Sequence, residues 1–571
     1  MKKKYTADFE TTTDINDCRV WAWGIFEIGS KDNFIYGNTI EGFIDWCQKA
    51  DNPVLYFHNL KFDSEFIFQY LLQNNYECIK DKKDKKDHSF TCLISDTGQF
   101  YTLEIYFKVK GKNISKVLIY DSMKLLNFSV EEIAKSFHLE VQKQELDYNA
   151  HREVGHILTD DEIKYLRCDV EIMAQALNIT FKEGLTKMTI GSNALNIYKN
   201  FNRNFEKYFP KLDYEIDSDI RKSYKGGFTY LNPKYENKTV EGGNVYDVNS
   251  LYPSVMHNEE LPIGQPKYFE GKYEYDPLYP LYVQQLACSF KIKEGKIPTI
   301  QIKKSLFFLP NQYIESSDDR IETLMLTSVD LEIFFEHYDV ENLIFGGGWK
   351  FKSMSGLFSE YIDFYTQLKI QSKKEGNRPR YLLSKLMLNS LYGKFGLNPN
   401  VQGKYPVLEN GEIHYKLYPK EVRDSIYLPV ATFITSYARR KTITTSQKIR
   451  DYSLKTYGED YYIYSDTDSI HTRGLPAEEL KDIIDIDPFR LGAWDNEASF
   501  SKGRYLRQKC YIEDINGKGV VVTVAGLPKK LGNVINFDNF DYNFVTSGKL
   551  VPKHVKGGVV LVDTEFTIKR K

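Results

Sequence analysis

The segment Tyr464-Ser465-Asp466-Thr467-Asp468-Ser469 decides the fold of the larger part of this 571-residue chain. Aromatic and β-branched residues precede its two aspartates, so we predict a strand that ends in a hairpin turn. Side chains alternate along an extended strand, and Asp466 and Asp468 are therefore expected to project to the same side. Such a pair suits a hard divalent cation, which prefers oxygen ligands, but it does not specify a reaction by itself.

Two further segments supply groups that a nucleotidyl-transfer site needs. In Asp247-Val-Asn-Ser-Leu-Tyr-Pro253 an apolar strand ends in an aspartate and a turn, so the acids of both segments can bind two metal ions that activate a primer hydroxyl. In the helical segment 385–394, Lys385, Asn389 and Tyr392 share one face. We expect the lysine to meet triphosphate oxygens and the tyrosine to lie against the incoming base or the templating pair. Taken alone, this segment is better explained as a helix with a polar face and a buried leucine stripe.

In this order, the three segments resemble motifs A, B and C of family B DNA polymerases. The resemblance implies that Asp247, Asp468 and the main chain of Val248 bind metal ions, with Asp466 as a catalytic residue beside them. It also implies that Tyr252 packs under the sugar and excludes a 2′-hydroxyl group. The implied nucleotide-binding residues are Val248, Tyr252, Lys385, Asn389 and Tyr392.

Three shorter elements extend the resemblance to DNA binding. Thr435-Ser-Tyr-Ala-Arg439 is similar to the T-x-x-G/A-R element near the template or primer, and Lys509-Cys-Tyr511 is similar to the K-x-Y element that holds the primer end. The second of these lies in a stretch, 501–511, with four basic residues and no acidic one. Tyr224-Lys-Gly-Gly227 is similar to the Y-x-G-G linker that coordinates the primer between two centres. The implied contacts are Tyr224, Gly226, Gly227, Thr435, Arg439, Arg507, Lys509 and Tyr511.

The amino-terminal third carries a second set of acids. Asp8 and Glu10 share one side of a predicted strand, and Asp63 follows another strand at the start of a helix. Asp169 lies one turn after Tyr165 on a later helix. Four acids and a tyrosine can hold two metal ions and a water molecule that attacks a terminal phosphodiester.

This second set resembles the Exo I, Exo II and Exo III motifs of DEDDy-type 3′→5′ exonucleases, which have a ribonuclease-H-like fold. The resemblance implies metal binding by the four acids, catalysis by these acids and Tyr165, and assistance from Lys143. Polar contacts and stacking are expected to hold a frayed single strand. The implied strand contacts are Thr11, Tyr56, His58, Asn59, Phe62 and Ser122.

Alternating strands and helices indicate an α/β multidomain protein, with strands at 5–9, 54–57 and 117–120 and helices at 62–72 and 162–177. Two long segments, before Lys385 and at 398–429, are similar to the insertions of protein-primed family B polymerases of small Bacillus phages. In that group the first insertion faces a priming protein and the second helps to encircle DNA. The resemblance implies a ribonuclease-H-like exonuclease domain followed by a right-hand polymerase domain of palm, fingers and thumb. The expected divisions are 1–187 (exonuclease), 188–260 (linker and start of the palm), 261–358 (first insertion, or terminal-protein region 1, with palm), 359–397 (fingers), 398–429 (second insertion, or terminal-protein region 2), 430–525 (palm) and 526–571 (thumb).

The composition limits the partners and the compartment. The net charge is 76 − 78 = −2, so any DNA contact must use local basic patches. Seven cysteines without a C-x-x-C pair indicate reduced thiols, and no apolar run approaches the ~18 residues of a membrane span. We therefore expect a soluble protein of the cytoplasm of a bacterial host cell, without membrane association. Lys80–Asp87 is expected to be a flexible exposed loop, and extra residues at Gly376–Arg380 leave open whether Lys369, Lys373 or Arg380 also meets triphosphate.

The resulting hypothesis is a DNA-directed DNA polymerase that replicates a viral genome by protein-primed, processive and strand-displacing synthesis, with 3′→5′ exonucleolytic proofreading. Its expected cofactors are two Mg²⁺ ions per centre, with Mn²⁺ as a substitute. Its expected partners are primer-template DNA, deoxynucleoside triphosphates, single-stranded DNA and a terminal protein that forms a heterodimer with it. Two alternatives remain open: an exonuclease whose carboxy-terminal region binds DNA without polymerising, and a noncatalytic scaffold that coats single strands.

Overall fold

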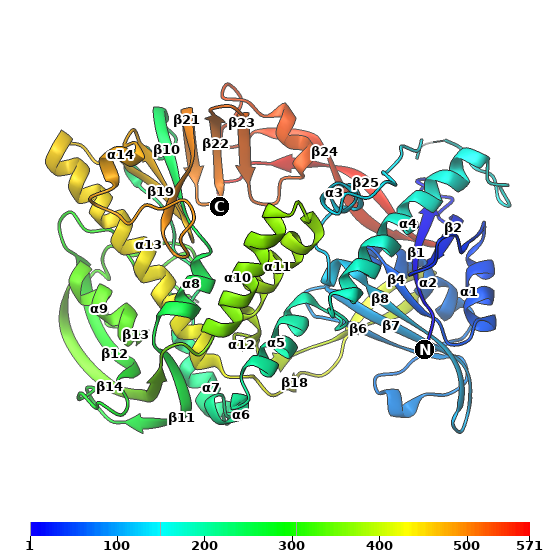
Figure 1. Cartoon of the computed structure of the whole chain (residues 1–571), viewed down its shortest axis with the longest axis horizontal. Helices are drawn as coiled ribbons and strands as arrows, with labels where there is room; N and C mark the ends of the chain where they lie inside the picture. The colour runs from blue at the N-terminus through cyan, green and yellow to red at the C-terminus, as the bar shows by residue number, and fades with distance from the viewer. Residues whose placement is uncertain (1, 149, 304, 571) are drawn as a thin grey trace.

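The chain forms three large β-sheets, and the strands of the third lie in the sequence between two strands of the second (Figure 1). The computed structural model describes residues 2–148, 150–303 and 305–570. The first sheet and its helices form a unit on the right of Figure 1, whereas the second and third sheets lie on the left. Between them stand two long helices, α10 (Ser359–Lys374) and α11 (Arg378–Ser390). The predicted multidomain α/β architecture is confirmed.

The amino-terminal sheet has the strand order β3-β2-β1-β4-β8-β7-β6-β5, in which β4 runs parallel to both of its neighbours. All four residues of β4 are buried, as expected for a strand covered on both faces. The strands and helices predicted in this region are confirmed. Their bounds are β1 Lys4–Thr11, β2 Val20–Glu27, β3 Phe34–Gly37, β4 Val54–Phe57, β5 Glu77–Cys78, β6 Ser89–Ile94, β7 Phe100–Lys110, β8 Asn113–Asp121, α1 Ile40–Lys49, α2 Leu60–Gln73, α3 Val130–Ser136 and α4 Asp160–Lys182.

Two helices of this domain begin at clear sequence signals. Helix α4 starts after Thr159, whose hydroxyl accepts a bond from the Glu162 amide while the Glu162 carboxylate accepts one from the Thr159 amide. Helix α2 starts after Asn59, which adopts a left-handed conformation with φ 74° and ψ 52°. This sharp turn out of β4 puts Asp63 in the first turn of α2. Both helices therefore carry acidic side chains toward the sheet at fixed points.

The second sheet is antiparallel, with the strand order β23-β22-β21-β10-β20-β19-β9, and the 30-residue helix α13 packs against it. Helix α13 has Pro429 in its first turn and ends at Gly458, which has φ 71°. A linker of three helices leads from the first domain into this sheet. The bounds are α5 Ile190–Phe201, α6 Phe205–Tyr208, α7 Tyr214–Ile220, β9 Thr229–Leu231, β10 Thr239–Val248, α8 Leu251–Asn258, α13 Leu428–Tyr457, β19 Tyr462–Asp466, β20 Ser469–Arg473, α14 Ala477–Leu480, β21 Trp494–Arg507, β22 Cys510–Ile515 and β23 Gly519–Val524.

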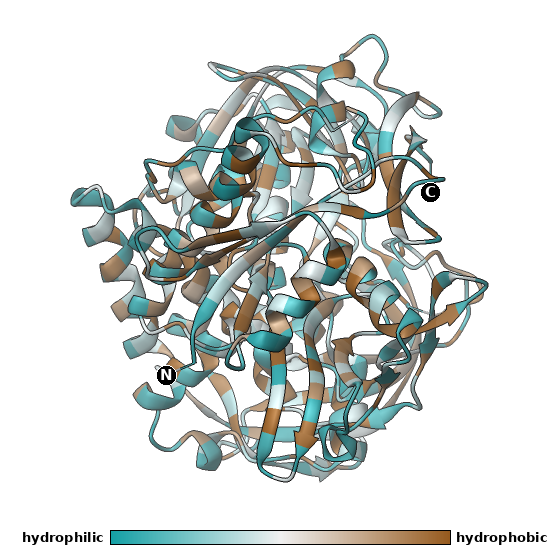
Figure 2. Cartoon of the chain, turned by 90° about the vertical axis from the view of Figure 1, so that its right-hand side faces the viewer, coloured by the Kyte–Doolittle hydropathy of each residue, from teal (hydrophilic) through white to brown (hydrophobic). Residues whose placement is uncertain are grey.

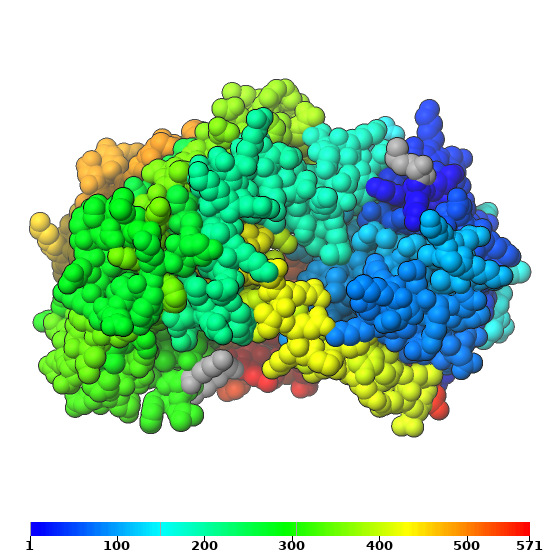
Figure 3. All heavy atoms as spheres, turned by 90° about the horizontal axis from the view of Figure 1, so that it is seen from below, coloured from blue at the N-terminus to red at the C-terminus, as the bar shows by residue number. Residues whose placement is uncertain are grey.

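Two insertions and a terminal hairpin complete the chain. The third sheet, of order β11-β14-β12-β13, lies between α8 and α10 in the sequence, and a second insertion of two short sheets lies between α12 and α13. Figure 3 shows the second insertion, in yellow, against the blue amino-terminal domain, and in Figure 1 the β24–β25 hairpin extends toward the same domain. The bounds are β11 Leu261–Phe269, β12 Leu281–Ile292, β13 Glu322–Thr327, α9 Ser328–His337, β14 Tyr338–Met354, α12 Tyr392–Phe395, β15 Asn400–Val401, β16 Lys404–Glu409, β17 Glu412–Leu417, β18 Glu421–Val422, β24 Val545–Val555 and β25 Gly558–Thr567.

Several smaller expectations can be compared with this fold. All seven cysteines are free thiols, as predicted. Among the described residues, no helix has both the length and the apolar character that a membrane crossing requires. In Figure 2 the brown hydrophobic residues lie along the strands and on parts of the helices, while the loops at the edges are mostly teal.

The charged loop at 80–87 is exposed over most of its length, as expected, and its flexibility stays a prediction. It contains a single 3₁₀ turn, Lys82–Asp84, and Lys82 forms an ion pair with the buried carboxylate of Glu104. One expectation needs correction. The single helical segment predicted at 385–394 is divided between α11 and α12 at Leu391, whose side chain is buried.

Candidate active sites

The first candidate site lies where β10 meets the β19–β20 hairpin. Strand β19 ends at Asp466, Thr467 adopts φ 61°, and β20 begins at Ser469, so the predicted hairpin is confirmed. Asp247 pairs opposite Ser469, and the amide of Val248 donates a 2.8 Å hydrogen bond to the carbonyl of Asp468. Asp247 and Asp468, which are 221 positions apart in the sequence (468 − 247), are thus neighbours in space.

The closeness of these two residues affects the charge of their carboxylates. Burial, followed by repulsion from Asp468, raises the pKa of Asp247 to about 7. Burial also raises the pKa of Asp468. Glu497 and Asp495 on β21 add further negative charge, while Lys385 acts in the opposite direction on Asp247. A concentration of partly buried acids of this kind is stabilised by a cation.

Asp466 has a different environment. Its two carboxylate oxygens each accept a 3.0 Å hydrogen bond from the amino group of Lys509, and it also accepts bonds from Thr229 (3.1 Å) and Tyr464 (3.2 Å). The expected alternation of Asp466 and Asp468 along one strand is wrong, because Asp468 lies in the turn after a left-handed residue. Asp466 is ion-paired to the protein, whereas Asp468 is turned toward Asp247.

Aromatic and basic side chains complete this first site. The rings of Tyr252 on α8 and Tyr392 at the start of α12 stack with centroids 4.2 Å apart. Ser250, immediately before α8, adopts φ 57°, so the chain turns sharply between Asp247 and Tyr252. Lys385 and Asn389 are exposed on α11, opposite a buried stripe of leucine and methionine. The interpretation as a helix with a polar face and a buried apolar stripe is confirmed, and contact of Lys385 with triphosphate stays a prediction.

The second candidate site joins β1, α2 and α4 in the amino-terminal domain. Asp8 and Glu10 lie on β1, Asp63 in the first turn of α2, and Asp169 in the middle of α4. Burial, followed by repulsion from Asp169, raises the pKa of Asp8 to about 7. Burial and the charge of Asp8 raise the pKa of both Glu10 and Asp63. The four predicted acids therefore meet in one buried cluster.

Lys143 and a pair of tyrosines flank this cluster. The amino group of Lys143 lies 2.7 Å from one oxygen of Asp169 and 5.7 Å from the centroid of the Tyr165 ring. Burial alone lowers the pKa of Lys143, but Asp169 reverses this and raises it above its ordinary value. The hydroxyl of Tyr165 lies 2.7 Å from that of Tyr148. Lys143 and Tyr165 thus stand beside the acids, as the sequence predicts.

The donor set fits divalent cations at both sites. The second oxygen of Asp169 is buried and has no hydrogen-bond partner among the described residues, so it is available to a ligand. In residues 2–148, 150–303 and 305–570 no three His, Cys, Asp or Glu side chains are already placed so that they could hold a metal ion together. Repulsion between carboxylates opposes such an arrangement, and hard cations readily take their remaining ligands from water and phosphate.

A family model, DNA polymerase type B, organellar and viral, matches residues 44–485. The chain belongs to the type B DNA polymerases. The DNA polymerase of Bacillus phage M2 is 44% identical over 100% of both chains, and that of Bacillus phage phi29 is 44% identical over 100% of this chain and 99% of its own. The DNA polymerase of Streptococcus phage Cp-1 is 31% identical over 99% of this chain and 98% of its own.

The fold of phi29 DNA polymerase agrees with this membership. Its complex with primer-template DNA and incoming nucleotide matches with a TM-score of 0.92 and 42% identity over 100% of both chains. The polymerase described here therefore has exonuclease and polymerase domains, and its family depends on divalent metal ions. We call the first domain the exonuclease domain, the second sheet the palm, α10 to α12 the fingers, and the β24–β25 hairpin the thumb hairpin.

The predicted strand contacts of the exonuclease domain divide into two groups. Asn59 and the half-buried Phe62 line a cavity, together with side chains from the second insertion and the thumb hairpin. Other members already form hydrogen bonds within the protein: His58 bonds the hydroxyl of Ser122 (2.9 Å) and the carbonyl of Phe128 (2.7 Å). Thr11 lies at the end of β1, with a half-buried side chain.

Tyr56 and Ser122 are buried in the exonuclease domain. The ring of Tyr56 stacks on Tyr120 at 5.4 Å and also contacts Phe181, and the side chain is 7% exposed. The hydroxyl of Ser122 donates to the carbonyl of Phe57 (2.9 Å). Tyr56, His58 and Ser122 are thus placed to hold the Asn59 turn in position.

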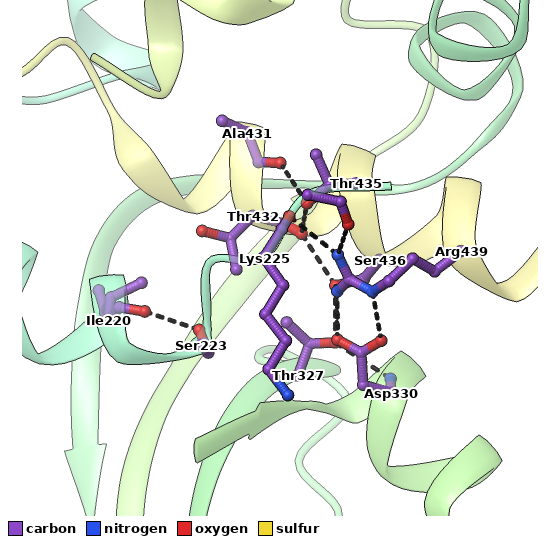
Figure 4. Close-up of polar contacts among 11 residues, drawn as sticks. Ile220, Ser223, Lys225, Thr327, Asp330, Ala431, Thr432, Thr435, Ser436 and Arg439 are labelled. Atoms are coloured by element: carbon purple, nitrogen blue, oxygen red, sulfur yellow. Dashed lines mark hydrogen bonds and ion pairs between the residues drawn. The ribbon is translucent and has the colours of Figure 1, made fainter. Parts of the chain in front are cut away.

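The T-x-x-G/A-R element of the palm is also internal (Figure 4). Arg439 forms two hydrogen bonds with Asp330 on α9, of 3.1 and 2.6 Å, and donates to the carbonyls of Lys225 and Gly226 at 2.9 and 2.8 Å. Thr435 bonds back to its own helix and is 2% exposed. Arg439 therefore positions the Y-x-G-G linker, and the Lys225 side chain in Figure 4 runs toward Thr327 and Asp330.

The linker and the K-x-Y element meet near the catalytic hairpin. A Cβ atom added to Gly227 would lie 2.6 Å from the hydroxyl of Thr467. A Cβ atom added to Gly396 would lie even closer to the hydroxyl of Tyr224. Lys509 binds Asp466, and Tyr511 stacks on Tyr505 at 5.5 Å. Gly226, in contrast, faces open space. The guanidinium of Arg507 donates to the carbonyl of Lys569 (3.0 Å), which ties the basic strand to the end of the chain.

The surroundings of Arg380 and Lys369 bear on which cation besides Lys385 could meet triphosphate. The guanidinium of Arg380 donates hydrogen bonds to the carboxylate of Glu183 at the end of α4, and the shortest N–O distance is 2.9 Å. The Arg380 side chain is thus directed toward the exonuclease domain. Lys369, in contrast, is close enough to Lys385 that burial and this like charge lower its pKa. Lys373 acts on Lys369 in the same direction, so contact of Lys369 or Lys373 with triphosphate stays a prediction.

Sequence reasoning missed residues that have no motif of their own. The hydroxyl of Tyr148 forms a hydrogen bond with that of Tyr165 beside the acids, and Asp121 accepts bonds from the amides of Asn59 and Met123. Asp330 is the buried acceptor for Arg439. The amino acid type alone gave no signal for Tyr148, but Asp121 follows a predicted strand, as the catalytic aspartates do.

Proposed function

We propose that this polymerase replicates a phage genome by protein-primed DNA synthesis, and that its exonuclease domain removes mismatched 3′ ends. The observation that carries the proposal is the presence of two separate clusters of mutually repelling carboxylates, one in the palm and one in the exonuclease domain. The whole-length likeness to phage DNA polymerases supports it. That likeness also argues against the alternatives of a nuclease that does not polymerise and of a noncatalytic scaffold.

We propose distinct roles for the palm residues during synthesis. Asp247, Asp468 and the main-chain carbonyl of Val248 would hold two Mg²⁺ ions, for which Mn²⁺ can substitute; such ions activate the primer hydroxyl and neutralise the leaving pyrophosphate. Lys385 balances triphosphate charge, and Asn389 lies one turn further along the same exposed face of α11. The stacked Tyr252 and Tyr392 form a wall under the sugar and base that leaves no room for a 2′-hydroxyl group.

The exonuclease residues suit hydrolysis of a terminal phosphodiester. Asp8, Glu10, Asp63 and Asp169 would hold two metal ions of the same kind. The hydroxyl of Tyr165, oriented by Tyr148, can hold the attacking water by a hydrogen bond. Lys143 compensates the charge of Asp169 and is placed to meet the negative charge that develops on the phosphate.

The domain divisions and partners follow from the same proposal. We assign 1–187 to the exonuclease, 188–260 to the linker and first palm segment, 261–358 to the first insertion with palm, 359–397 to the fingers, 398–429 to the second insertion, 430–525 to the palm and 526–571 to the thumb. The partners are primer-template DNA, deoxynucleoside triphosphates, single-stranded DNA and a terminal protein bound as a heterodimer. Complexes of phi29 DNA polymerase with primer-template DNA, nucleotide and single-stranded DNA support the first three. The phage relatives support a place of action in the host-cell cytoplasm.

Separation-of-function variants test the two centres. Asp468→Asn should abolish primer extension with Mg²⁺ and leave degradation of single-stranded 3′ ends unchanged, because Asp468 belongs to the palm cluster alone. Asp169→Asn should have the opposite effect. Loss of both activities in each correctly folded variant would contradict two independent centres.

Protein priming is tested separately. Incubation with a candidate terminal protein, labelled deoxynucleotide and Mg²⁺ should give a covalent protein-nucleotide adduct, and Asp468→Asn should remove it. Normal extension of a DNA primer without any such adduct would restrict the function to primer-dependent synthesis.

A further inference from the structure

Three domains meet at one buried carboxylate. Glu65 lies on α2 of the exonuclease domain and is 3% exposed. One of its oxygens accepts a 2.8 Å hydrogen bond from the hydroxyl of Tyr415, which belongs to β17 of the second insertion. The other oxygen lies 3.3 Å from Nε2 of His554, on β24 of the thumb hairpin. Positions 65, 415 and 554 are thus joined through one acid.

The apolar surroundings show that this junction is packed. Val555, Val559 and Val560 of the thumb hairpin and Ile413 of the second insertion belong to the same hydrophobic core as the exonuclease sheet. At the tip of the thumb hairpin, Gly558 lies so close to Phe66 that a Cβ atom would be 2.6 Å from its ring. The thumb hairpin therefore docks closely into the exonuclease domain, which the red strands of Figure 1 reach from the palm.

The charges at the junction depend on this docking. The second oxygen of Glu65 is buried and makes no well-aligned hydrogen bond in the described residues, so His554 is the cation that faces it. The Glu65 carboxylate beside it raises the pKa of His554, and burial opposes this change. Glu412 on β17 acts in the same direction as Glu65, and Lys61 on α2 acts against it. Separation of the domains would leave Glu65 without either partner.

The same contacts close one side of a cavity of about 360 Å³. Its lining combines the predicted strand contacts Asn59 and Phe62 with cationic and aromatic side chains from other domains. These additional lining residues include Lys404, Tyr415 and His554, and Lys61 of the exonuclease domain also lines the cavity. Because the lining comes from all three domains, the cavity exists only while they are joined.

We propose that Glu65, Tyr415 and His554 form an interdomain lock that fastens the thumb hairpin and the second insertion to the exonuclease domain. The lock holds the three domains as a closed unit beside the DNA path and is strongest when His554 carries a proton. Neither proofreading nor protein priming is needed for the lock, which concerns the joining of domains in the whole polymerase.

Hydrogen exchange of the thumb hairpin tests the lock directly. In the full-length protein, exchange of residues 545–567, corrected for intrinsic rates, should increase by about three- to tenfold between pH 6 and pH 8, the range in which a histidine of raised pKa loses its proton. The sign follows from the raised pKa: the contribution is complete at low pH and is lost as the pH rises. Glu65→Gln should increase exchange at pH 6, because the amide cannot pair with a cation.

Two substitutions of His554 distinguish the lock from simple packing. His554→Gln should remove the pH dependence and give high exchange throughout, whereas His554→Lys should keep the cation and give low exchange at both pH values. His414→Gln is the matched control, because His414 is exposed on the same β17 strand as Tyr415.

Dissociation from primer-template DNA gives a second readout. The wild-type enzyme should dissociate faster at pH 8 than at pH 6, and His554→Lys should not. A pH dependence of exchange in His554→Gln equal to that of the wild type would refute the lock. Unchanged exchange in Glu65→Gln would refute it as well, whatever the catalytic activity of either variant.

Discussion

Replacement of Asp330 by asparagine is the sharpest test of how the palm is held together. Asp330 is bonded by Arg439, by the hydroxyl of Ser436 (2.9 Å) and by that of Thr327 (3.0 Å). The side chains of the Asp330–Arg439 pair are only 12% and 6% exposed. Asparagine keeps the size of the side chain but removes its charge, which leaves the guanidinium unpaired near the Lys225 ammonium. Loss of one partner of a buried ion pair costs about 3–5 kcal/mol.

Hydrogen exchange of α13 measures this cost locally. At about 1.4 kcal/mol per tenfold change, amides around Arg439 should exchange about two to four orders of magnitude faster in Asp330→Asn, if they open with the palm. The matched control is Asp45→Asn, which breaks an exposed pair with Lys49 whose side chains are 56% and 74% exposed. That change should cost about 0.3–0.5 kcal/mol and leave α13 unaffected. Exchange within threefold of the wild type in Asp330→Asn would refute the assigned role of the pair.

The pH dependence of the same variant provides an independent check. Burial favours the neutral acid, but Arg439 holds the pKa of Asp330 below its ordinary value of 3.8. A lowered pKa means that the stabilisation is fully present above pH 3.8 and is lost as the pH falls through the lowered value. The difference in stability between the wild type and Asp330→Asn should therefore shrink in thermal melts recorded below pH 3.8. A difference that grows in acid would contradict the sign.

Three further outcomes are expected. Lys143→Met should lower the exonuclease rate about 10- to 100-fold, because a charge-assisted hydrogen bond is lost, and should leave polymerisation unchanged. Equal loss in both assays would contradict a role of Lys143 in the exonuclease centre alone. Lys509→Met should lower extension of a matched primer by a similar factor of about 10 to 100, because it frees Asp466, and hydrolysis of single strands serves as the control. Arg380→Glu should raise the KM for nucleotide about two- to fivefold by releasing the fingers from the exonuclease domain, and the double variant with Glu183→Arg should restore it; failure of that rescue would show that the ion pair is not the cause.

The acids of both centres could be predicted from the sequence because they lie in short local motifs whose spacing places the carboxylates together. Asp8 and Glu10 are two positions apart on one strand, and a strand places such residues on the same side whatever the rest of the chain does. The hairpin at 466–468 could be recognised for the same reason. The detail of that hairpin could not, because the left-handed conformation of Thr467 depends on packing, including the close approach of Gly227.

Contacts between domains could not be predicted from local patterns. Arg439 was expected near DNA, yet its hydrogen bonds go to Asp330 and to the linker, which are 109 and 213 to 214 positions away. Arg380 was considered for triphosphate binding and is paired with Glu183 across 197 positions. An arginine side chain forms similar bonds with a phosphate and a carboxylate, so residue type alone does not distinguish these partners.

One physical feature connects the two centres: each has a lysine beside its acids. Lys143 lies 2.7 Å from Asp169, Lys509 lies 3.0 Å from Asp466, and Lys385 lowers the cost of the charge on Asp247. Clusters of buried acids repel one another, so a fold that presents them needs cations of its own to remain stable before substrate arrives. Because Lys143 and Lys509 each contact one acid and leave others unpaired, the same arrangement that stabilises the protein keeps carboxylate oxygens available for metal ions. The near-neutral net charge of the chain is therefore compatible with two strongly acidic centres, since their compensation is local.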